Sequence, residues 1–210
     1  GTLVVGDHRA LRQAFRYLGV PRDRIPTDTY PPAVRGYLRR RVWENTVAGV
    51  RSCPVPMFVK PKDDPKKFTG AVIANPSDAA ALTGGVSRKT RVYCGEVVNW
   101  VSEYRVFVLR SRIVGVKRYG GDGSVRIDMN VVEAFIRDFD GSGESTSGYG
   151  VDFGILESGD TAMVEWNDGY ALGSYGLEAE TYTDLLIARW EEIMEGRIEL
   201  EGPIDNAKIL

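Results

Sequence analysis

The chain has 210 residues, of which 27 are basic and 29 acidic, giving a net charge of −2 and a pI near 5.6. This length suits one large domain or a domain of two lobes, and the balanced charge gives no reason to expect a nucleic-acid partner. No apolar run approaches the roughly 18 residues that span a membrane, and no leader pattern opens the sequence, so we expect a cytoplasmic protein without membrane contact.

Cysteine and histidine, the usual zinc ligands and catalytic nucleophile or base, are few. Cys53 and Cys94 are the two cysteines, and His8 is the single histidine. Two cysteines make no disulfide framework, so we expect reduced, buried thiols, and a zinc site is disfavoured. A hydrolase with a Ser-His-Asp or Cys-His device would have to use His8, for which we expect a surface or capping role.

The first third of the chain predicts one strand and two helices. Residues 2–5, TLVV, are typical of a short buried strand, and Asp7 caps a predicted helix that continues to about Leu18. This opening suggests a short α/β segment. Residues 22–32 are proline-rich and irregular, and residues 32–51 are predicted to be helical with a basic outer face.

From Pro54 onward the pattern changes to strands. "VPMFVKP" and "GAVIA" predict strands, and "DAAALTGG" predicts a short helix closed by glycine. Three more strands are predicted at residues 92–98, 103–109 and 113–118, the last two forming a hairpin.

The last third predicts a second hairpin between two helices. "MNVVEAFIRDF" has its apolar residues on one side of a helix and is followed by a flexible polar loop. "YGVDFGIL" and "TAMVEWN" predict the hairpin, and "ETYTDLLIARWEEIMEG" predicts the closing helix. The class is α+β, with helices packed on antiparallel sheets.

Polar residues interrupt the apolar strands of the second hairpin. Glu165 and Asn167 are two residues apart and share one face of their strand, and the hairpin can bring Asp152 opposite them. Two carboxylates and an amide oxygen on one face form a hard oxygen site of the kind that Mg²⁺ prefers. The alternative is a solvated strand edge with ordinary acids.

Cationic side chains interrupt the apolar pattern of the earlier strands in the same way. Glu103 and Arg105 share a face, and Lys117 lies on the partner strand, so this group predicts either a phosphate site or a cross-strand salt bridge. Lys60 lies within an apolar strand, where a lysine needs an anion. "KKFTG" ends a basic loop whose Gly70 allows close backbone approach to phosphate, although GxxxxGK[ST] and GxGxxG are both absent.

Three stretches together resemble the ATP-grasp domain family, and in particular its small clade named for one arginine and two lysines. They are "MFVKPKDDPKKFTG", "GEVVNWVSEYRVFVLRSRIVGVKRYGG" and "YGVDFGILESGDTAMVEWNDGYALGSYGL", which together reach from residue 57 to about residue 177. The resemblance implies two α+β lobes that clamp ATP. It departs from the larger enzymes in that "KDDPKKFTG" replaces their glycine-rich phosphate loop.

The resemblance also implies site roles. For the nucleotide, Lys60 contacts phosphates, the backbone of Glu96, Val97 and Val98 meets adenine, Glu103 holds the ribose, and Arg105 and Lys117 are phosphate or substrate cations. Lys67 competes for one of these assignments, and Lys62 and Lys66 also remain open as the second phosphate ligand. Asp152, Glu165 and Asn167 correspond to the family's metal triad, and Lys60, Arg105 and Lys117 are the implied catalytic cations.

The loop "GYALGSYG" follows the metal strand and is expected to line the acceptor pocket through Tyr170, Gly173, Ser174 and Tyr175. The alternative is a glycine-rich turn whose tyrosines pack on the sheet. The expected domains are an N-terminal segment at 1–53, a small lobe at 54–92 and a large lobe at 93–210. In the family that the chain resembles, a longer preceding domain often helps to build the acceptor site, so the short N-terminal segment here leaves the location of that site undecided.

The resulting hypothesis is an ATP- and Mg²⁺-dependent carboxylate–amine ligase that works through an acyl phosphate and releases ADP. Its substrates are expected to be a small-molecule or peptide carboxylate and an amine. A kinase acting on a small molecule or protein, and a nucleotide-binding interaction module without turnover, are the alternatives.

Overall fold

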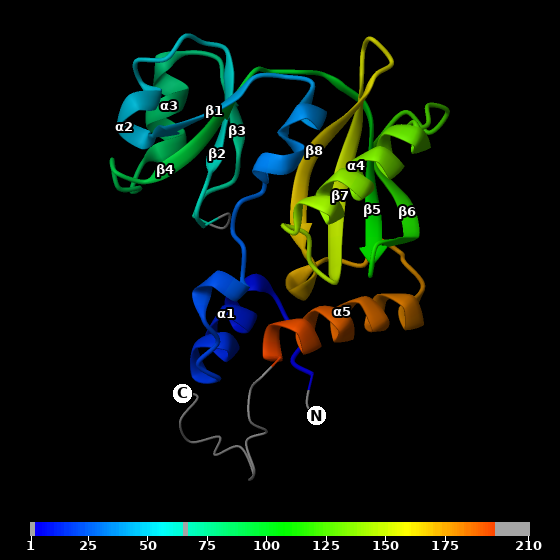
Figure 1. Cartoon of the computed structure of the whole chain (residues 1–210). Helices are drawn as coiled ribbons and strands as arrows, with labels where there is room; N and C mark the ends of the chain where they lie inside the picture. Colours follow the sequence, from blue (N-terminus) through cyan, green and yellow to red (C-terminus); the bar gives the residue numbers. More distant parts are fainter. Residues whose placement is uncertain (1–2, 65–66, 196–210) are drawn as a thin grey trace.

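The computed structural model describes residues 3–64 and 67–195, and it contains two four-stranded antiparallel sheets with helices packed around them (Figure 1). Lys66, residue 2 and residues 196–210, which the predictions above include, lie outside the described residues. The predicted α+β class is confirmed.

The first sheet, sheet A, has the strand order β1-β4-β2-β3. Its strands are β1 (Val42–Thr46), β2 (Met57–Pro61), β3 (Ala71–Ile73) and β4 (Arg91–Gly95). The short helices α2 (Val47–Val50) and α3 (Pro76–Thr83) supply apolar side chains to a core that includes Met57, Val59 and Ile73. Asn75 caps α3 through a complete capping box, and Gly84 follows the last turn.

The second sheet, sheet B, has the order β6-β5-β7-β8. Its strands are β5 (Trp100–Leu109), β6 (Arg112–Gly121), β7 (Gly148–Leu156) and β8 (Thr161–Asp168). Arg110 and Ser111 both have positive φ in the tight turn between β5 and β6, as a two-residue hairpin of this hand requires.

Helix α4 (Met129–Ser142) covers one face of sheet B (Figure 1). Its side chains Val132, Phe135, Ile136 and Phe139 are buried, as its apolar spacing predicted. They pack on alternate residues of the strands, among them Val106, Val151, Phe153 and Trp166. The residues between these, which include Arg105 and Asp152, therefore point to the opposite face of the sheet.

Two further helices lie beside the ends of the strands, below both sheets in Figure 1. Helix α1 (His8–Tyr17) begins at Asp7, whose carboxylate accepts from the backbone of Arg9 and Ala10, as predicted. Helix α5 (Ala179–Met194) follows the short turn η3 (Gly169–Ala171). Leu11 and Phe15 of α1 pack with Tyr170 and Ile193, which joins these elements into one small core.

Two predicted elements are wrong. Residues 3–5 form no strand; Val5 is 61% exposed, and Val4 is half-buried against the small core of α1 and α5. Residues 32–51 are not one helix but η2 (Pro32–Leu38), β1 and α2. Arg39 ends η2 in the left-handed conformation, and the β-branched residues after it pair with β4 instead.

Other details sharpen the predictions. β4 stops at Gly95, three residues before the predicted end, and η1 (Arg22–Arg24) lies in the irregular segment. Cys53 and Cys94 are free, with Cys94 buried and Cys53 half-buried. The division into three domains stays a prediction, and sheet A takes strands from both sides of the expected boundaries at 53/54 and 92/93. Within the described residues, no helix has the length and apolarity to span a membrane.

Candidate functional site

Four charged residues form a row across sheet B, on the face opposite α4. Lys117 pairs in register with Arg105, Arg105 with Asp152, and Asp152 with Glu165. Cross-strand partners present their side chains on the same face, so two cations and two carboxylates stand side by side. Asn167 lies two residues beyond Glu165. The hairpin therefore brings Asp152 opposite Glu165, as its sequence predicted, and a register shift directly after Asp152 interrupts the ladder there.

The centre of the row is a buried ion pair. Arg105 donates two hydrogen bonds to Asp152, at 2.7 Å to Oδ1 and 2.6 Å to Oδ2, and both side chains are at most 7% exposed. Asn167 Nδ2 lies 3.4 Å from Asp152 Oδ2. Burial raises the pKa of Asp152 to about 6, although the guanidinium opposes that rise. Arg105 thus forms a cross-strand salt bridge, but with Asp152 of β7 and not within the predicted group of Glu103, Arg105 and Lys117.

Lys60 reaches the row from the other sheet. It stands in β2 of sheet A, and its Nζ donates to Glu165 Oε2 of sheet B at 2.8 Å. The ammonium also lies 3.9 Å from the centroid of the Tyr30 ring. Burial by itself would lower the pKa of Lys60, but the Glu165 carboxylate raises it above its ordinary value. The lysine in the apolar strand does meet an anion, and this contact joins the two sheets.

These side chains line a cleft of about 580 Å³ between the sheets and α1. Six of the predicted site residues border it, namely Lys60, Arg105, Glu165, Asn167, Gly173 and Tyr175. Asp7, His8 and Arg12 from the start of α1 and Phe68, Thr69 and Gly70 from the loop before β3 complete opposite sides of its wall.

The residues predicted to hold adenine lie in the connection between β4 and β5, and Glu103, predicted to hold the ribose, lies in β5. Glu96, Val97 and Val98 follow the end of β4 and lead from sheet A into sheet B. Arg41 N donates to Glu96 Oε2 at 2.9 Å, which fixes this connection beside β1. Glu103 lies on the same strand face as Arg105 and accepts from Tyr119 Oη at 3.2 Å.

The remaining candidate lysines differ in their surroundings. Lys62 pairs with Glu44, and its side chain is 13% exposed. Lys67 is exposed at the tip of the loop between β2 and β3, where its backbone N–H donates to Asp64 O at 2.9 Å. Lys117 is half-buried beside Arg105. Of the three, Lys117 is the one that pairs across strands with a member of the buried ion pair, Arg105.

The two tyrosines of the loop after β8 point in different directions. Tyr170 is buried and points to α1, where its hydroxyl lies 3.0 Å from His8 Nε2 and its ring meets Phe15 edge-on. Tyr175 is exposed, has φ +46°, and places its ring 4.5 Å from the Arg105 guanidinium carbon. Ser174 is exposed at the loop tip. Tyr175 and Gly173 border the cleft, whereas Tyr170 packs against α1 and not on the sheet as the alternative had it.

The donor chemistry of the three predicted metal ligands fits Mg²⁺. Asp152, Glu165 and Asn167 offer carboxylate and amide oxygens on neighbouring strand positions. Over the described ranges, no group of three or more His, Cys, Asp and Glu side chains could hold a metal ion, so a site here would use two carboxylates and the amide. Both carboxylates are paired with cations, Asp152 with Arg105 and Glu165 with Lys60.

Sequence reasoning missed Tyr30 and the contribution of α1. Tyr30 lies in the proline-rich segment before η2, where no periodicity indicates which side chains are buried. Arg12 belongs to the predicted helix, but no motif there singles it out. The only available signal was Asp7, which marks the first turn that the cleft meets.

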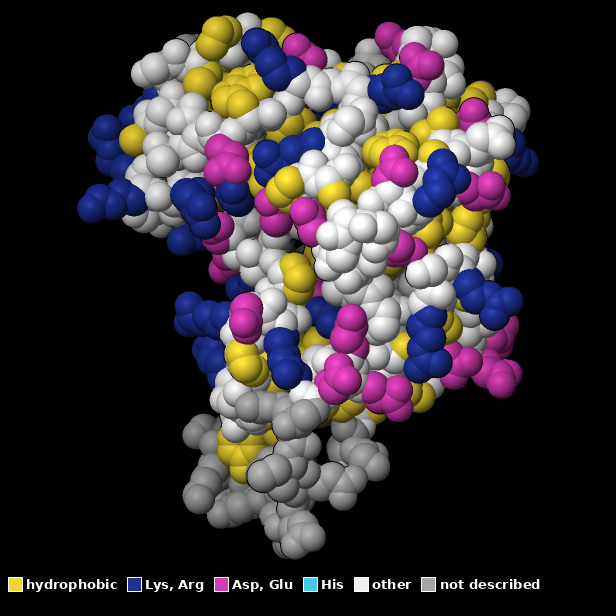
Figure 2. Space-filling view, in the orientation of Figure 1, with side chains coloured by type: hydrophobic (Ala, Val, Ile, Leu, Met, Phe, Trp, Pro, Cys, Tyr) yellow, Lys and Arg dark blue, Asp and Glu magenta, His cyan; other side chains and the backbone are white. Residues whose placement is uncertain are grey.

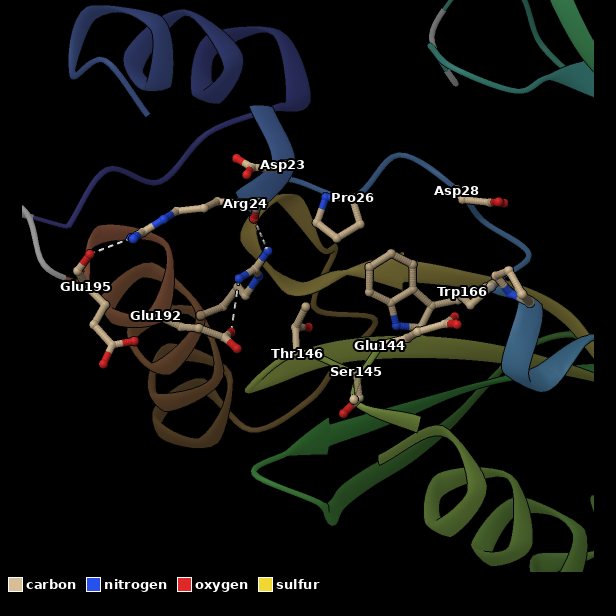
Figure 3. Close-up of a pocket in the computed structure, with 14 residues that line it drawn as sticks. Asp23, Arg24, Pro26, Asp28, Glu144, Ser145, Thr146, Trp166, Glu192 and Glu195 are labelled. Carbon is tan, nitrogen blue, oxygen red and sulfur yellow. Dashed lines mark hydrogen bonds and ion pairs between the residues drawn. The ribbon is translucent and has the colours of Figure 1, made fainter. Parts of the chain in front are cut away.

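A second cavity, of about 570 Å³, lies between residues 23–32, the loop at 143–146 and α5 (Figure 3). Carboxylates surround it in Figure 3, from Asp23, Glu144, Glu192 and Glu195. None of the predicted site residues lines it, and its acidic wall is unsuited to phosphate. The cleft at Lys60 is therefore the candidate site.

Comparisons with known families and solved structures identify the family and the fold. Residues 37–185 match an ATP-grasp domain family, which is family 2 of the clade named for one arginine and two lysines. No curated protein matches the chain.

Solved structures share the fold at low sequence identity. D-alanine–D-alanine ligase from Bacillus anthracis is 12% identical with a TM-score of 0.52, and the alignment covers 90% of this chain and 67% of that one. N5-carboxyaminoimidazole ribonucleotide synthetase in its ADP complex is 11% identical with a TM-score of 0.53, covering 88% and 51%. The chain thus spans between about half and two thirds of the length of these two proteins.

Proposed function

Because the chain belongs to family 2 of the one-arginine, two-lysine clade of ATP-grasp domains, we propose that it is an ATP- and Mg²⁺-dependent carboxylate–amine ligase that forms an amide and releases ADP. One observation carries the proposal. The cleft between the sheets brings Lys60 from sheet A to the row of charges on sheet B, so cations and oxygen donors face the same space.

The predicted site residues have proposed tasks, whether they border the cleft or lie beyond its wall. The backbone of Glu96, Val97 and Val98 holds adenine, and Glu103 holds the ribose hydroxyls. Lys60, Arg105 and Lys117 neutralise phosphate oxygens, with Lys67 as a competitor for the last position. For Lys60 and Arg105, phosphate oxygens would take the place of the carboxylates with which they are paired.

Asp152, Glu165 and Asn167 would hold Mg²⁺, which supplies positive charge beside the phosphates. The other proposed contributions come from the chain. Its fixed cations lie in a partly buried cleft, where charge stabilisation is stronger than in water. Gly173 and Tyr175 would border the acceptor.

The proposed reaction has two steps. A carboxylate oxygen of the substrate attacks the γ-phosphorus, the bond from that phosphorus to the β–γ bridging oxygen breaks, and ADP leaves. An amine then attacks the acyl carbon, the bond from this carbon to the phosphate oxygen breaks, and inorganic phosphate leaves while the nitrogen loses a proton to solvent. Neither step needs a covalent bond to the protein, which suits a cleft whose histidine is packed against Tyr170.

Thermal unfolding with a non-hydrolysable ATP analogue tests the nucleotide site. At about 100 times its Kd, a ligand that binds only the folded state adds about 2.7 kcal/mol, which raises the midpoint by a few degrees. We expect a Mg²⁺-dependent rise for the native sequence, a much smaller one for Glu165→Gln, and a native response for the control Glu133→Gln at an exposed position of α4. No rise at millimolar nucleotide would remove the proposal.

Product analysis then tests the reaction. With ATP, Mg²⁺ and a panel of carboxylates and amines, we expect ADP release that requires both substrates and yields an amide. ADP release with a stable phosphorylated acceptor and no amide would make the protein a kinase. Nucleotide binding without ADP release from any pair would favour the interaction module.

A further inference from the structure

The small net charge conceals a strong division along the chain. Residues 1–95 contain 17 Lys and Arg against 7 Asp and Glu, whereas residues 96–210 contain 10 against 22. The first part forms α1 and the whole of sheet A, and the second forms sheet B with α4 and α5. The charge division of the sequence is therefore also a division of the folded molecule.

The basic part forms a continuous side of the molecule. In Figure 2, Lys and Arg side chains gather along the left edge, over sheet A and over α1, while Asp and Glu gather over α5 at the lower right. We call the left edge the basic side. Helix α1 contributes Arg9, Arg12 and Arg16 and contains no acidic residue within His8–Tyr17.

Many of these cations form no ion pair with the part of the chain that the structure describes. Over residues 3–64 and 67–195, eight exposed cations of the basic half form neither an ion pair nor a side-chain hydrogen bond, namely Arg9, Arg16, Arg22, Arg39, Arg51, Lys67, Arg88 and Lys89. Exposed charges of one sign attract oppositely charged partners and steer their approach.

The basic side opens onto the candidate site. Arg12 of α1 and Asp64 of the loop between β2 and β3 stand 3.5 Å apart, and both elements contribute residues to the wall of the cleft. Arg9 and Arg16 flank Arg12 on α1, and Lys67 follows Asp64 in the loop. A chain bound along α1 would thus enter the cleft beside Lys60 and Arg105.

We propose that the basic side is a docking surface for an acidic peptide, which places one of its carboxylates in the cleft as the group to be activated. This inference rests on the proposed function, because it names the substrate class of the same site. A peptide rich in Asp and Glu supplies both the negative charge that the basic side attracts and the functional group that the reaction consumes.

The charge division favours a peptide over a nucleic acid. A nucleic acid carries one negative charge per nucleotide along its whole length, so a strand that extends beyond the basic side meets the acidic half of the molecule. A peptide can bear acidic residues where it crosses α1 and neutral residues elsewhere. The phosphodiester backbone also offers no carboxylate.

Fluorescence anisotropy on the full chain tests the inference. The probe is a labelled glutamate-rich peptide, compared with its glutamine counterpart and with a single-stranded oligonucleotide of equal charge. We expect the glutamate peptide to bind, and to bind about tenfold more weakly to Arg9→Glu/Arg16→Glu. The milder pair Arg9→Gln/Arg16→Gln should give an intermediate loss, and it keeps the test open if the charge reversal disturbs α1.

The matched control is Arg112→Glu/Arg137→Glu, which makes the same change of net charge on exposed positions of β6 and α4. We expect this control to bind the peptide within about twofold of the native sequence, and raised salt to weaken the native complex. Equal losses in both pairs, equal binding of the glutamine peptide, or tighter binding of the oligonucleotide would each overturn the inference.

Nucleotide-dependent stabilisation, measured on the same variants, separates this inference from the proposed function. We expect Arg9→Glu/Arg16→Glu to keep the full shift, because neither residue borders the cleft. If the variant loses peptide binding but keeps the nucleotide-dependent rise in the unfolding midpoint, only the docking surface has been altered. If the native protein shows no such rise, the proposed nucleotide site is wrong.

Discussion

Lys60 is one of the buried charged residues that line the cleft. Its side chain is about 10% exposed in an otherwise apolar strand, where an unpaired ammonium would be strongly unfavourable. Glu165 and the Tyr30 ring together make the position tolerable. A cation held so near the acidic end of the row is ready to interact with an entering phosphate.

The first prediction concerns this lysine. Lys60→Met keeps the length and apolar stem but removes the charge, so nucleotide affinity should fall at least tenfold, which is about 1.4 kcal/mol or more. Titration of the Mg²⁺–nucleotide complex measures this. Lys89→Met, at an exposed position without an ion pair, is the control and should bind as the native protein does. Unchanged affinity in Lys60→Met would move the phosphate role to Lys67 or Lys117.

At this scale the sequence predicted which residues would meet, but not all of their partners. The alternation of apolar and polar residues placed Asp152 opposite Glu165, because strand geometry fixes which side chains share a face. The sequence could not show that Arg105 bonds Asp152, since the pairing of β5 with β7 joins segments far apart in the chain. Tyr30 and Tyr170 lie in irregular segments, where no period fixes a side chain's direction.

Among the elements, α5 is fastened to the end of β8 by one arginine. Arg189 donates to both oxygens of Asp168 at 2.7 Å, to Glu192 at 3.0 Å and to Arg24 O at 2.8 Å. The side chains of Arg189 and Asp168 are both at most 5% exposed. The contact holds the strand that carries Glu165 and Asn167 against the helix and the N-terminal segment.

The second prediction follows from this contact. Arg189→Met leaves the Asp168 carboxylate buried without its main partner, so the free energy of unfolding should fall by about 3–5 kcal/mol. Denaturant titration measures the change, and Arg137→Met on the exposed face of α4 serves as the control. The double variant Arg189→Met/Asp168→Asn should regain part of the loss. A single variant as stable as the control would contradict this account of α5.

Helices and strands whose apolar residues recur at a regular spacing were predicted well, whereas segments without such a spacing were not. The hairpins of sheet B and the helices α4 and α5 follow their apolar patterns. Residues 32–51 have apolar positions that also suit a helix, but pairing with β4 outweighs that local preference for residues 42–46. Residues 3–5 are apolar but pair with no strand, and Val4 packs against the core of α1 and α5 instead.

At the scale of the whole molecule, the two sheets meet at the candidate site through few direct contacts. Lys60 to Glu165 is one, and Arg40, which lies just before β1, also reaches sheet B by donating to the backbone oxygens of Met163 and Val164. The family and the fold could be predicted from motif order, yet the width of the cleft depends on this packing and on α1. A nucleotide bound there would contact both sheets.

The third prediction is made for the whole chain. Mg²⁺ and a non-hydrolysable ATP analogue should slow amide hydrogen exchange together in β2 and β3 of sheet A and in β8 of sheet B, by about tenfold or more near saturation. Exchange of α4, on the far face of sheet B, should change least. Mass spectrometry of exchanged peptides measures this, and protection confined to one sheet would mean that the nucleotide does not lie between them.

The row of four charges also constrains how this chain can diverge. Lys117, Arg105, Asp152 and Glu165 face one way only because their strands are in register, and the direction of a side chain reverses with each residue. An insertion or deletion of one residue within β5, β7 or β8 would turn part of the row toward α4, whereas a change of two residues, or one absorbed by a bulge, would keep it. Related chains that retain the site should therefore differ freely in loop length but follow a parity rule within these strands.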